Sequence, residues 1–285
     1  MNIISRLLLT FPLLIVFSLA HGQKNENDFI EYLYQSENYD HLRVYQNHLK
    51  EVDSLNYNLD LLNFLIGKSY YHQQIHDSSN IYLNRITKGE GFQQSRFLIG
   101  INSVYINDYG QAKNVLNSTT FKSDELQNLK FFQLSGIALL ERDYESYHLY
   151  TNKIFEDYYF FQKEKESFQQ IEKDLQLYNK KSPFLAGLYS AILPGAGKFY
   201  AGKKGQGIYS FVISSLLALQ AIESYQKAGL KSARFIIYGG LFSLFHVGNV
   251  WSSALAVKKY NDEFYEAVDY RIKLDMHIPI RSFFN

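Results

Sequence analysis

Three long stretches without Asp, Glu, Lys or Arg dominate the C-terminal part of this 285-residue chain. They cover residues 182–197, 205–222 and 235–257, and are 16, 18 and 23 residues long. At 1.5 Å of helical rise per residue they reach about 24, 27 and 35 Å, against the ~30 Å hydrocarbon core of a bilayer. The last two are therefore expected to cross a membrane as helices, and the first is short for that role.

The first stretch is also interrupted by Pro194 and Gly195, since proline ends a helix and glycine permits unusual backbone angles. It predicts either a distorted span or a segment that enters the bilayer and returns. Three crossings place the basic residues near 198–204 and 258–259 in the cytoplasm and the basic loop at 227–234 outside, in keeping with the positive-inside rule. We expect three crossings with a cytoplasmic C-terminus; a returning segment reverses these sides.

Small side chains recur at every fourth position in both longer stretches. Helices associate in lipid by close packing, so two such stripes predict a helical hairpin that packs along them. The helix-packing positions are Ser210, Ser214 and Ala218 in one stretch and Gly248, Ser252 and Ala256 in the other. His246 and Asn249 lie in the longest stretch without a charged partner in the pattern, which favours hydrogen bonds between helices.

The connection between the first two stretches is Leu193-Pro-Gly-Ala-Gly-Lys-Phe-Tyr-Ala-Gly202. A P-loop would need a hydroxyl side chain at Phe199, and a dinucleotide-binding loop would need a glycine at Tyr200, so both nucleotide sites are excluded. The proline and glycines instead predict an interfacial turn, with aromatic residues at the headgroup level and lysines near lipid phosphates.

This connection resembles a module of bacterial membrane proteins of unknown function, some of which carry tetratricopeptide repeats. The matching residues form the membrane turn motif: Pro194, Gly195, Gly197, Tyr200, Gly202 and Gly205. Asn249 and Lys259-Tyr260-Asn261 match the module more weakly, and Lys198 stands where the module has glutamine. The resemblance implies a membrane module and no particular reaction.

The N-terminal part shows helical patterns in pairs, over 61–71 with 78–86, 97–105 with 111–116, and 129–140 with 144–154. The turns within the pairs centre on Tyr39, Ile75, Tyr109 and Tyr144, which are 36, 34 and 35 residues apart. This interval is close to the 34-residue tetratricopeptide period.

Gly100, Tyr109 and Ala112 look like the small, aromatic and small positions of one tetratricopeptide (TPR) unit, and Gly67 and Gly136 match the first small position of theirs. The resemblance implies an all-α solenoid of divergent TPR-like helical hairpins whose concave face holds a protein or peptide partner. Its register places these partner-binding residues on that face: Phe64, Lys68, Tyr71, Phe97, Ile101, Lys130 and Gln133.

The N-terminus has the pattern of a secretory signal, in which Arg6 precedes an uncharged run over 7–20 and Ala20-His21-Gly22 offers a cleavage site. We expect a signal peptide over 1–22, repeats over 23–157 and a capping or linking helix over 158–181. A membrane module over 182–260 and a C-terminal polar helix with a short aromatic tail over 261–285 complete the chain.

Several functional classes find no support in the sequence. The chain has no cysteine, and its net charge of +1 with no basic patch gives no reason to expect nucleic-acid binding. His72 and His76 are four residues apart but lack a third ligand, so no metal site is predicted. No cofactor-binding or catalytic site is predicted either.

The favoured hypothesis is an exported adaptor, anchored in the bacterial cytoplasmic membrane, whose repeats outside the cytoplasm bind a protein or peptide. The alternative is a small transport or lipid-handling membrane module that the repeats regulate.

Overall fold

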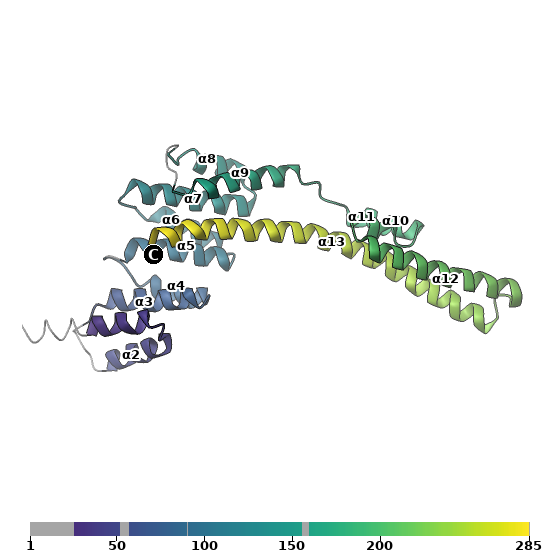
Figure 1. Cartoon of the computed structure of the whole chain (residues 1–285), viewed down its shortest axis with the longest axis horizontal. Helices are drawn as coiled ribbons and strands as arrows, with labels where there is room; N and C mark the ends of the chain where they lie inside the picture. The colour runs from purple at the N-terminus through teal and green to yellow at the C-terminus, as the bar shows by residue number, and fades with distance from the viewer. Residues whose placement is uncertain (1–25, 52–56, 90, 156–159, 285) are drawn as a thin grey trace, which may run out of the picture. The chain divides into compact units, whose positions relative to one another are not determined.

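The computed structural model describes residues 26–51, 57–89, 91–155 and 160–284, so the expected signal peptide lies outside the described residues. Every regular element in these ranges is a helix, and none of the described residues forms a strand. The chain divides into two units, Met1–Gln170 with Ile272–Asn285, and Ile171–Arg271. Figure 1 shows the helices coloured along the chain.

The first unit is a row of helices that pack mainly on their neighbours in chain order. A helix over 26–35 comes first. It is followed by α2 (Tyr39–Glu51), α3 (Leu59–His72), α4 (His76–Leu83), α5 (Phe92–Tyr105), α6 (Tyr109–Ser118), α7 (Asp124–Glu141) and α8 (Tyr144–Thr151). The expected helical pairs are therefore present as α3 with α4, α5 with α6, and α7 with α8.

Each turn within a pair has the same backbone design. The first helix of each pair is followed by one non-glycine residue in the left-handed region of backbone conformation. These residues are Glu37, Gln74, Asn107 and Arg142, with φ values of 56°, 60°, 62° and 61°. The amide of the next residue then donates to a carbonyl five residues back, as Asp108 N does to Ser103 O at 2.8 Å. This is the hydrogen-bond pattern of a Schellman motif, repeated four times along the unit.

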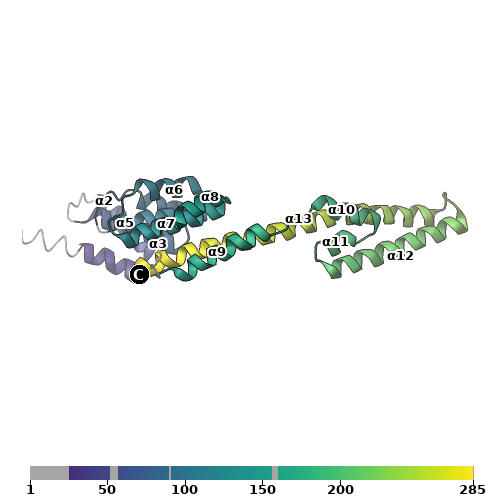
Figure 2. The same cartoon turned by 90° about the horizontal axis from the view of Figure 1, so that it is seen from above.

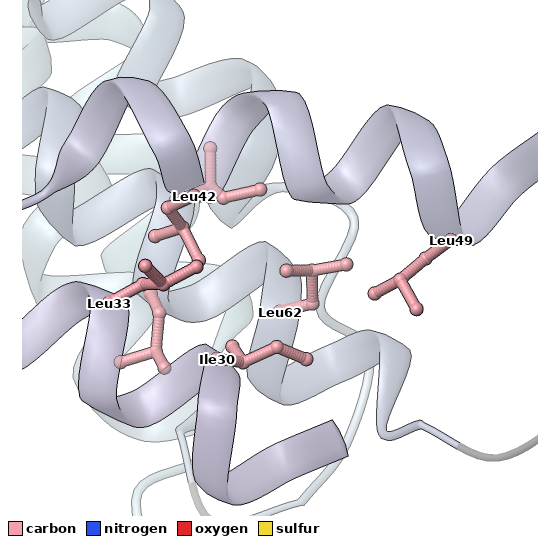
Figure 3. Close-up of a cluster of buried hydrophobic side chains, with 7 residues drawn as sticks. Ile30, Leu33, Leu42, Leu49 and Leu62 are labelled. Atoms are coloured by element: carbon pink, nitrogen blue, oxygen red, sulfur yellow. The ribbon is translucent and has the colours of Figure 1, made fainter.

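Small residues and leucines fix the contacts inside the pairs. A Cβ at Gly67 would lie 2.6 Å from Cδ2 of Leu83, and one at Gly100 would lie 3.5 Å from Leu116. Both glycines thus face the second helix of their own pair. At the N-terminal end, seven buried aliphatic side chains form a core cluster: Ile30, Leu33, Leu42, Leu49, Leu62, Leu65 and Ile66 (Figure 3).

The helix α9 (Gln162–Leu177) begins at the other end of this row. Phe161 and Phe168 are buried, and their rings lie 4.6 and 4.7 Å from the ring of Phe132 on α7. The capping or linking helix expected over 158–181 therefore packs on α7 through aromatic residues at and near its N-terminal end.

The second unit contains two helices that are long and apolar enough, by length and composition, to cross a membrane. They are α12 (Lys204–Ala228) and the first part of α13 (Ala233–Phe284), which lie side by side in Figures 1 and 2. The shorter α10 (Pro183–Ile192) and α11 (Ala196–Tyr200) come before them. With 10 residues, α10 is about 15 Å long, half the thickness of a hydrocarbon core. The first apolar stretch therefore forms no spanning helix, in contrast to the three crossings expected from the sequence.

The C-terminal region also differs from the expected polar helix and aromatic tail. Instead of ending near Tyr270, α13 continues without interruption to Phe284, through Pro279. It contributes its first part to the second unit and residues Ile272–Asn285 to the first.

Candidate functional site

The end of α13 lies among the helices of the first unit (Figure 1). Ile272, Met276 and Ile280 are four residues apart on one face of this helix and are at most 1% exposed. We call residues 272–284 the C-terminal segment. Its contacts identify a helix-binding face on the first unit.

His277 is the polar centre of these contacts. Its Nε2 is hydrogen-bonded to the hydroxyl of Tyr71 on α3, and its Nδ1 lies 3.1 Å from the hydroxyl of Tyr105 on α5. A neutral imidazole has one donor and one acceptor nitrogen, so one tyrosine donates to His277 and the other accepts from it.

A second anchor comes from α7. The side-chain amide of Gln133 donates to the backbone carbonyl of Met276 at 2.7 Å. On the next turn, Gly136 leaves room for the side chain of Met276, whose Cγ would lie 2.6 Å from a Cβ at that position. Gly136, which the TPR resemblance matched to the first small position of its unit, therefore makes room for the C-terminal segment and for Phe168.

The last residues of the segment reach α5. The ring of Phe284 lies 5.7 Å from that of Phe97, and its carbonyl accepts from the side-chain amide of Gln94 at 3.4 Å. At the other end, Nζ of Lys273 donates to Oδ1 of Asn107 at 2.8 Å. The face thus binds the segment along its whole length.

Three of the seven expected partner-binding residues, Tyr71, Phe97 and Gln133, contact the C-terminal segment. The other four have different surroundings. Ile101 is fully buried in α5, and Nζ of Lys130 donates to the carbonyl of Thr119 at 3.5 Å.

Lys68 extends its ammonium group over the rings of Tyr34 and Phe64, at 5.5 Å from each centroid. The Phe64 ring also lies 2.9 Å from where a Cβ would stand on Gly91.

The sequence-based prediction missed Tyr105 and the whole C-terminal segment. The signal that was available is the spacing of Ile272, Met276 and Ile280, which marks one face of a helix. This apolar stripe is short and comes at the end of a long helical pattern. The spacing alone does not indicate which surface of the protein the stripe packs against.

Burial governs the electrostatics of this face. It raises the pKa of the Tyr71 hydroxyl, and the nearby Tyr105 adds to this effect. Burial is also the largest cause that lowers the pKa of His277. The positive charge of Arg281, and then His76 and His72, lower it further. Burial therefore favours the neutral form of both groups at pH 7.

The membrane turn motif forms the link from α10 through α11 to α12. Pro194 lies in the turn after α10, and Gly195 has φ of 89°. A Cβ at Gly195 would overlap the carbonyl oxygen of Gly207 on α12, and one at Gly197 would overlap that of Ala186 on α10. These two glycines permit close backbone approaches, which is the geometric role expected for the motif.

The remaining motif residues differ from one another. Gly202 has φ of 79° with open space around it, and Gly205 is also open. The hydroxyl of Tyr200 accepts from the amide of Ser182 at 3.2 Å, and its carbonyl accepts from Nζ of Lys181 at 2.9 Å.

Asn261 completes the same corner of the second unit. Its Oδ1 accepts from the hydroxyl of Tyr178 at 2.9 Å and from the amide of Lys181 at 3.2 Å. Its Nδ2 donates to the carbonyl of Lys181 at 2.9 Å. Asn261, a weak match to the module, is thus a buried side chain whose hydrogen bonds hold the chain just before α10.

The expected helix-packing residues lie in two environments. Ser210, Ser214, Gly248 and Ser252 line a cavity between α12 and α13. Ala256 instead packs in a small cluster with Ala186 and Val257, and Ala218 is half-buried. His246 makes an interhelical contact, with Nε2 lying 3.1 Å from the carbonyl of Ala191.

The histidines that are four apart point to different partners. Nε2 of His72 lies 3.0 Å from the hydroxyl of Tyr34, and Nδ1 of His76 lies 2.8 Å from Oδ1 of Asn102. Among the residues described, no three His, Asp or Glu side chains gather as a metal site requires.

Comparisons of the chain with protein-family models, with curated proteins and with solved structures found no match. The tetratricopeptide and membrane-module resemblances therefore remain predictions from the residues named above.

Proposed function

We propose that this protein is a membrane-anchored adaptor of a bacterial envelope, in which TPR-like repeats bind a helical segment of a partner protein. The observation that carries the proposal is the helix-binding face, where Tyr71, Tyr105 and Gln133 contact both side-chain and backbone atoms of a helix. In the structure this helix is the chain's own C-terminal segment. A partner helix with a similar apolar stripe would exchange with it.

The same contacts support a proposal for the number of membrane crossings. Because residues 272–284 pack within the first unit, they lie on the same side of the membrane as the repeats, so an even number of crossings separates the two. Two spanning helices, α12 and the apolar part of α13, satisfy this condition. We therefore propose two crossings, with the repeats and the C-terminus together.

Two sequence signals bear on which side this is. The secretory signal pattern over 1–22 favours export, whereas lysines are more numerous near the helix ends on the repeat side than in the 227–234 loop. The first export signal usually dominates orientation, so we place the repeats outside the cytoplasm and the loop inside.

Affinity capture from detergent extracts tests the adaptor function. Partners should be recovered with the full chain and lost when residues 24–180 are removed. Retention of all partners after this deletion would instead favour the membrane module as the functional part.

A pair of full-length variants then tests the face itself. Met276 is buried against α7, and Ile278 in the same helix turn is 41% exposed. Met276→Glu places a charge in the contact and should release the segment, increasing partner capture by about tenfold, since a buried charge without a partner costs several kcal/mol. Ile278→Glu is the matched control and should leave capture unchanged. Equal capture by both variants would contradict exchange at this face.

A further inference from the structure

A cavity of about 380 Å³ lies between α12 and α13 in the second unit. Its polar side is formed by Lys198, Asn249 and the hydroxyls of Ser210, Ser214 and Ser252. A Cβ at Gly248 would meet nothing within 4 Å, so the glycine opens the cavity further. The small residues of the two helices therefore create space here.

Lys198 supplies a positive charge to this cavity. Its Nζ donates to Oγ of Ser210 at 2.7 Å, and no carboxylate in the described part of the chain pairs with it. Burial lowers its pKa. An ammonium group has three donors, so at least one remains for a ligand after the bond to Ser210.

Asn249 faces the same space without a partner. It is 5% exposed, and neither Oδ1 nor Nδ2 of its side chain has a hydrogen bond. Buried amides in proteins are nearly always hydrogen-bonded, because desolvating one without a partner costs free energy. A donor without an acceptor and an unpaired cation that line one cavity form an arrangement that an anionic oxygen satisfies.

The other walls of the cavity are apolar and open outward. Leu244 and Phe245 are 72% and 48% exposed on α13, within the part of that helix that is apolar enough for lipid. Ser210 lies six residues into α12, about 9 Å from its start. This depth corresponds to the boundary between headgroups and acyl chains when Lys204 lies at the surface.

We propose that this cavity binds the phosphate group of an anionic phospholipid, with Lys198 and Asn249 as donors and an acyl chain along Leu244 and Phe245. A phosphate diester carries one negative charge, which the single ammonium group neutralises, and none of the lining residues is a carboxylate that could pair with a cationic headgroup. The apolar walls favour a lipid over free phosphate, because free phosphate would leave them without a partner.

Native mass spectrometry of the full-length protein tests this, with phosphatidylglycerol and phosphatidylcholine added in turn to the detergent-solubilised chain. The wild type should prefer phosphatidylglycerol. Lys198→Met and Asn249→Leu should each weaken its binding by about tenfold, the usual effect of losing a charge-assisted or buried hydrogen bond. Lys204→Met removes a nearby exposed lysine and should have no such effect, whereas Lys198→Arg keeps the charge and should retain most of the affinity.

Thermal unfolding without lipid separates binding from folding. Leucine at position 249 removes an unsatisfied buried amide, so Asn249→Leu should raise the lipid-free melting temperature while weakening lipid binding. Equal affinity for the two lipids, or unchanged phosphatidylglycerol binding in both cavity variants, would overturn the proposal. Displacement of the lipid by millimolar inorganic phosphate would overturn it as well, since the ligand would then be the free anion.

Discussion

Gly197 and Gly205 belong to the same turn motif and have different surroundings. Gly197 lies against the backbone of α10, and its amide donates to Oγ of Ser190 at 2.9 Å. Gly205 has no atom within 4 Å of where a Cβ would stand. The motif thus combines one position that only glycine can occupy with another that tolerates a side chain.

Alanine substitution should separate these two roles. Gly197→Ala forces the Ala186 carbonyl away and should lower the free energy of unfolding by about 3 kcal/mol, at the upper end for overpacking. Gly205→Ala should change it by less than about 1 kcal/mol, because the position is open and helical. Thermal unfolding in detergent measures both, and equal effects would show that α10 and α11 do not pack as described.

At the scale of elements, the contact between the C-terminal segment and the face that binds it includes partly buried groups whose neutral forms are favoured. His277 lies between the hydroxyls of Tyr71 and Tyr105, with Arg281, His76 and His72 as the nearby basic groups. Protonation of His277 would place a charge in this partly buried, already positive environment.

The contact should therefore weaken in acid. The pKa of His277 is lowered from 6.5 in the folded protein, so its contribution to stability is complete above pH 6.5 and is lost as the pH falls toward the lowered value. Amide hydrogen exchange of residues 272–284, corrected for intrinsic rates, should show less protection at pH 5.5 than at pH 7.5. His277→Gln keeps a hydrogen-bonding side chain that does not titrate and should reduce this pH dependence. Protection that increases in acid would contradict the account.

Local patterns in the sequence were enough to predict the three helical pairs of the first unit. The turns centred on Tyr39, Ile75, Tyr109 and Tyr144 lie within one residue of the starts of α2, α4, α6 and α8. Proline and clustered glycines also predicted a turn between the first two apolar stretches, but not the backbone atoms that Gly195 and Gly197 approach.

The binding face could be predicted only in part. The repeat register placed Tyr71, Phe97 and Gln133 on it, but Tyr71 and His277 are 206 residues apart in the chain. Helical periodicity says which side of an element is apolar and says nothing about which distant element covers it. The polar cavity was missed for the same reason, because a stripe of small residues is compatible with close packing or with an open space.

At the scale of the whole molecule, α13 connects the two units through one continuous helix of 52 residues. Its apolar part belongs to the proposed membrane hairpin, and its last turns lie on the helix-binding face of the first unit. The protein contains no cysteine, so this arrangement can be tested by labelling introduced cysteines. Single cysteines can therefore report on each region without further changes.

The most direct test labels three single-cysteine variants with a membrane-impermeant maleimide. Thr120→Cys reports on the repeats, Ser282→Cys on the C-terminal segment and Ala233→Cys on the hairpin loop, and all three positions are exposed. In intact spheroplasts the first two should be labelled and the third should be labelled only after permeabilisation. Labelling of Thr120→Cys and Ser282→Cys from opposite sides of the membrane would contradict the central claim that the repeats and the end of α13 form one unit.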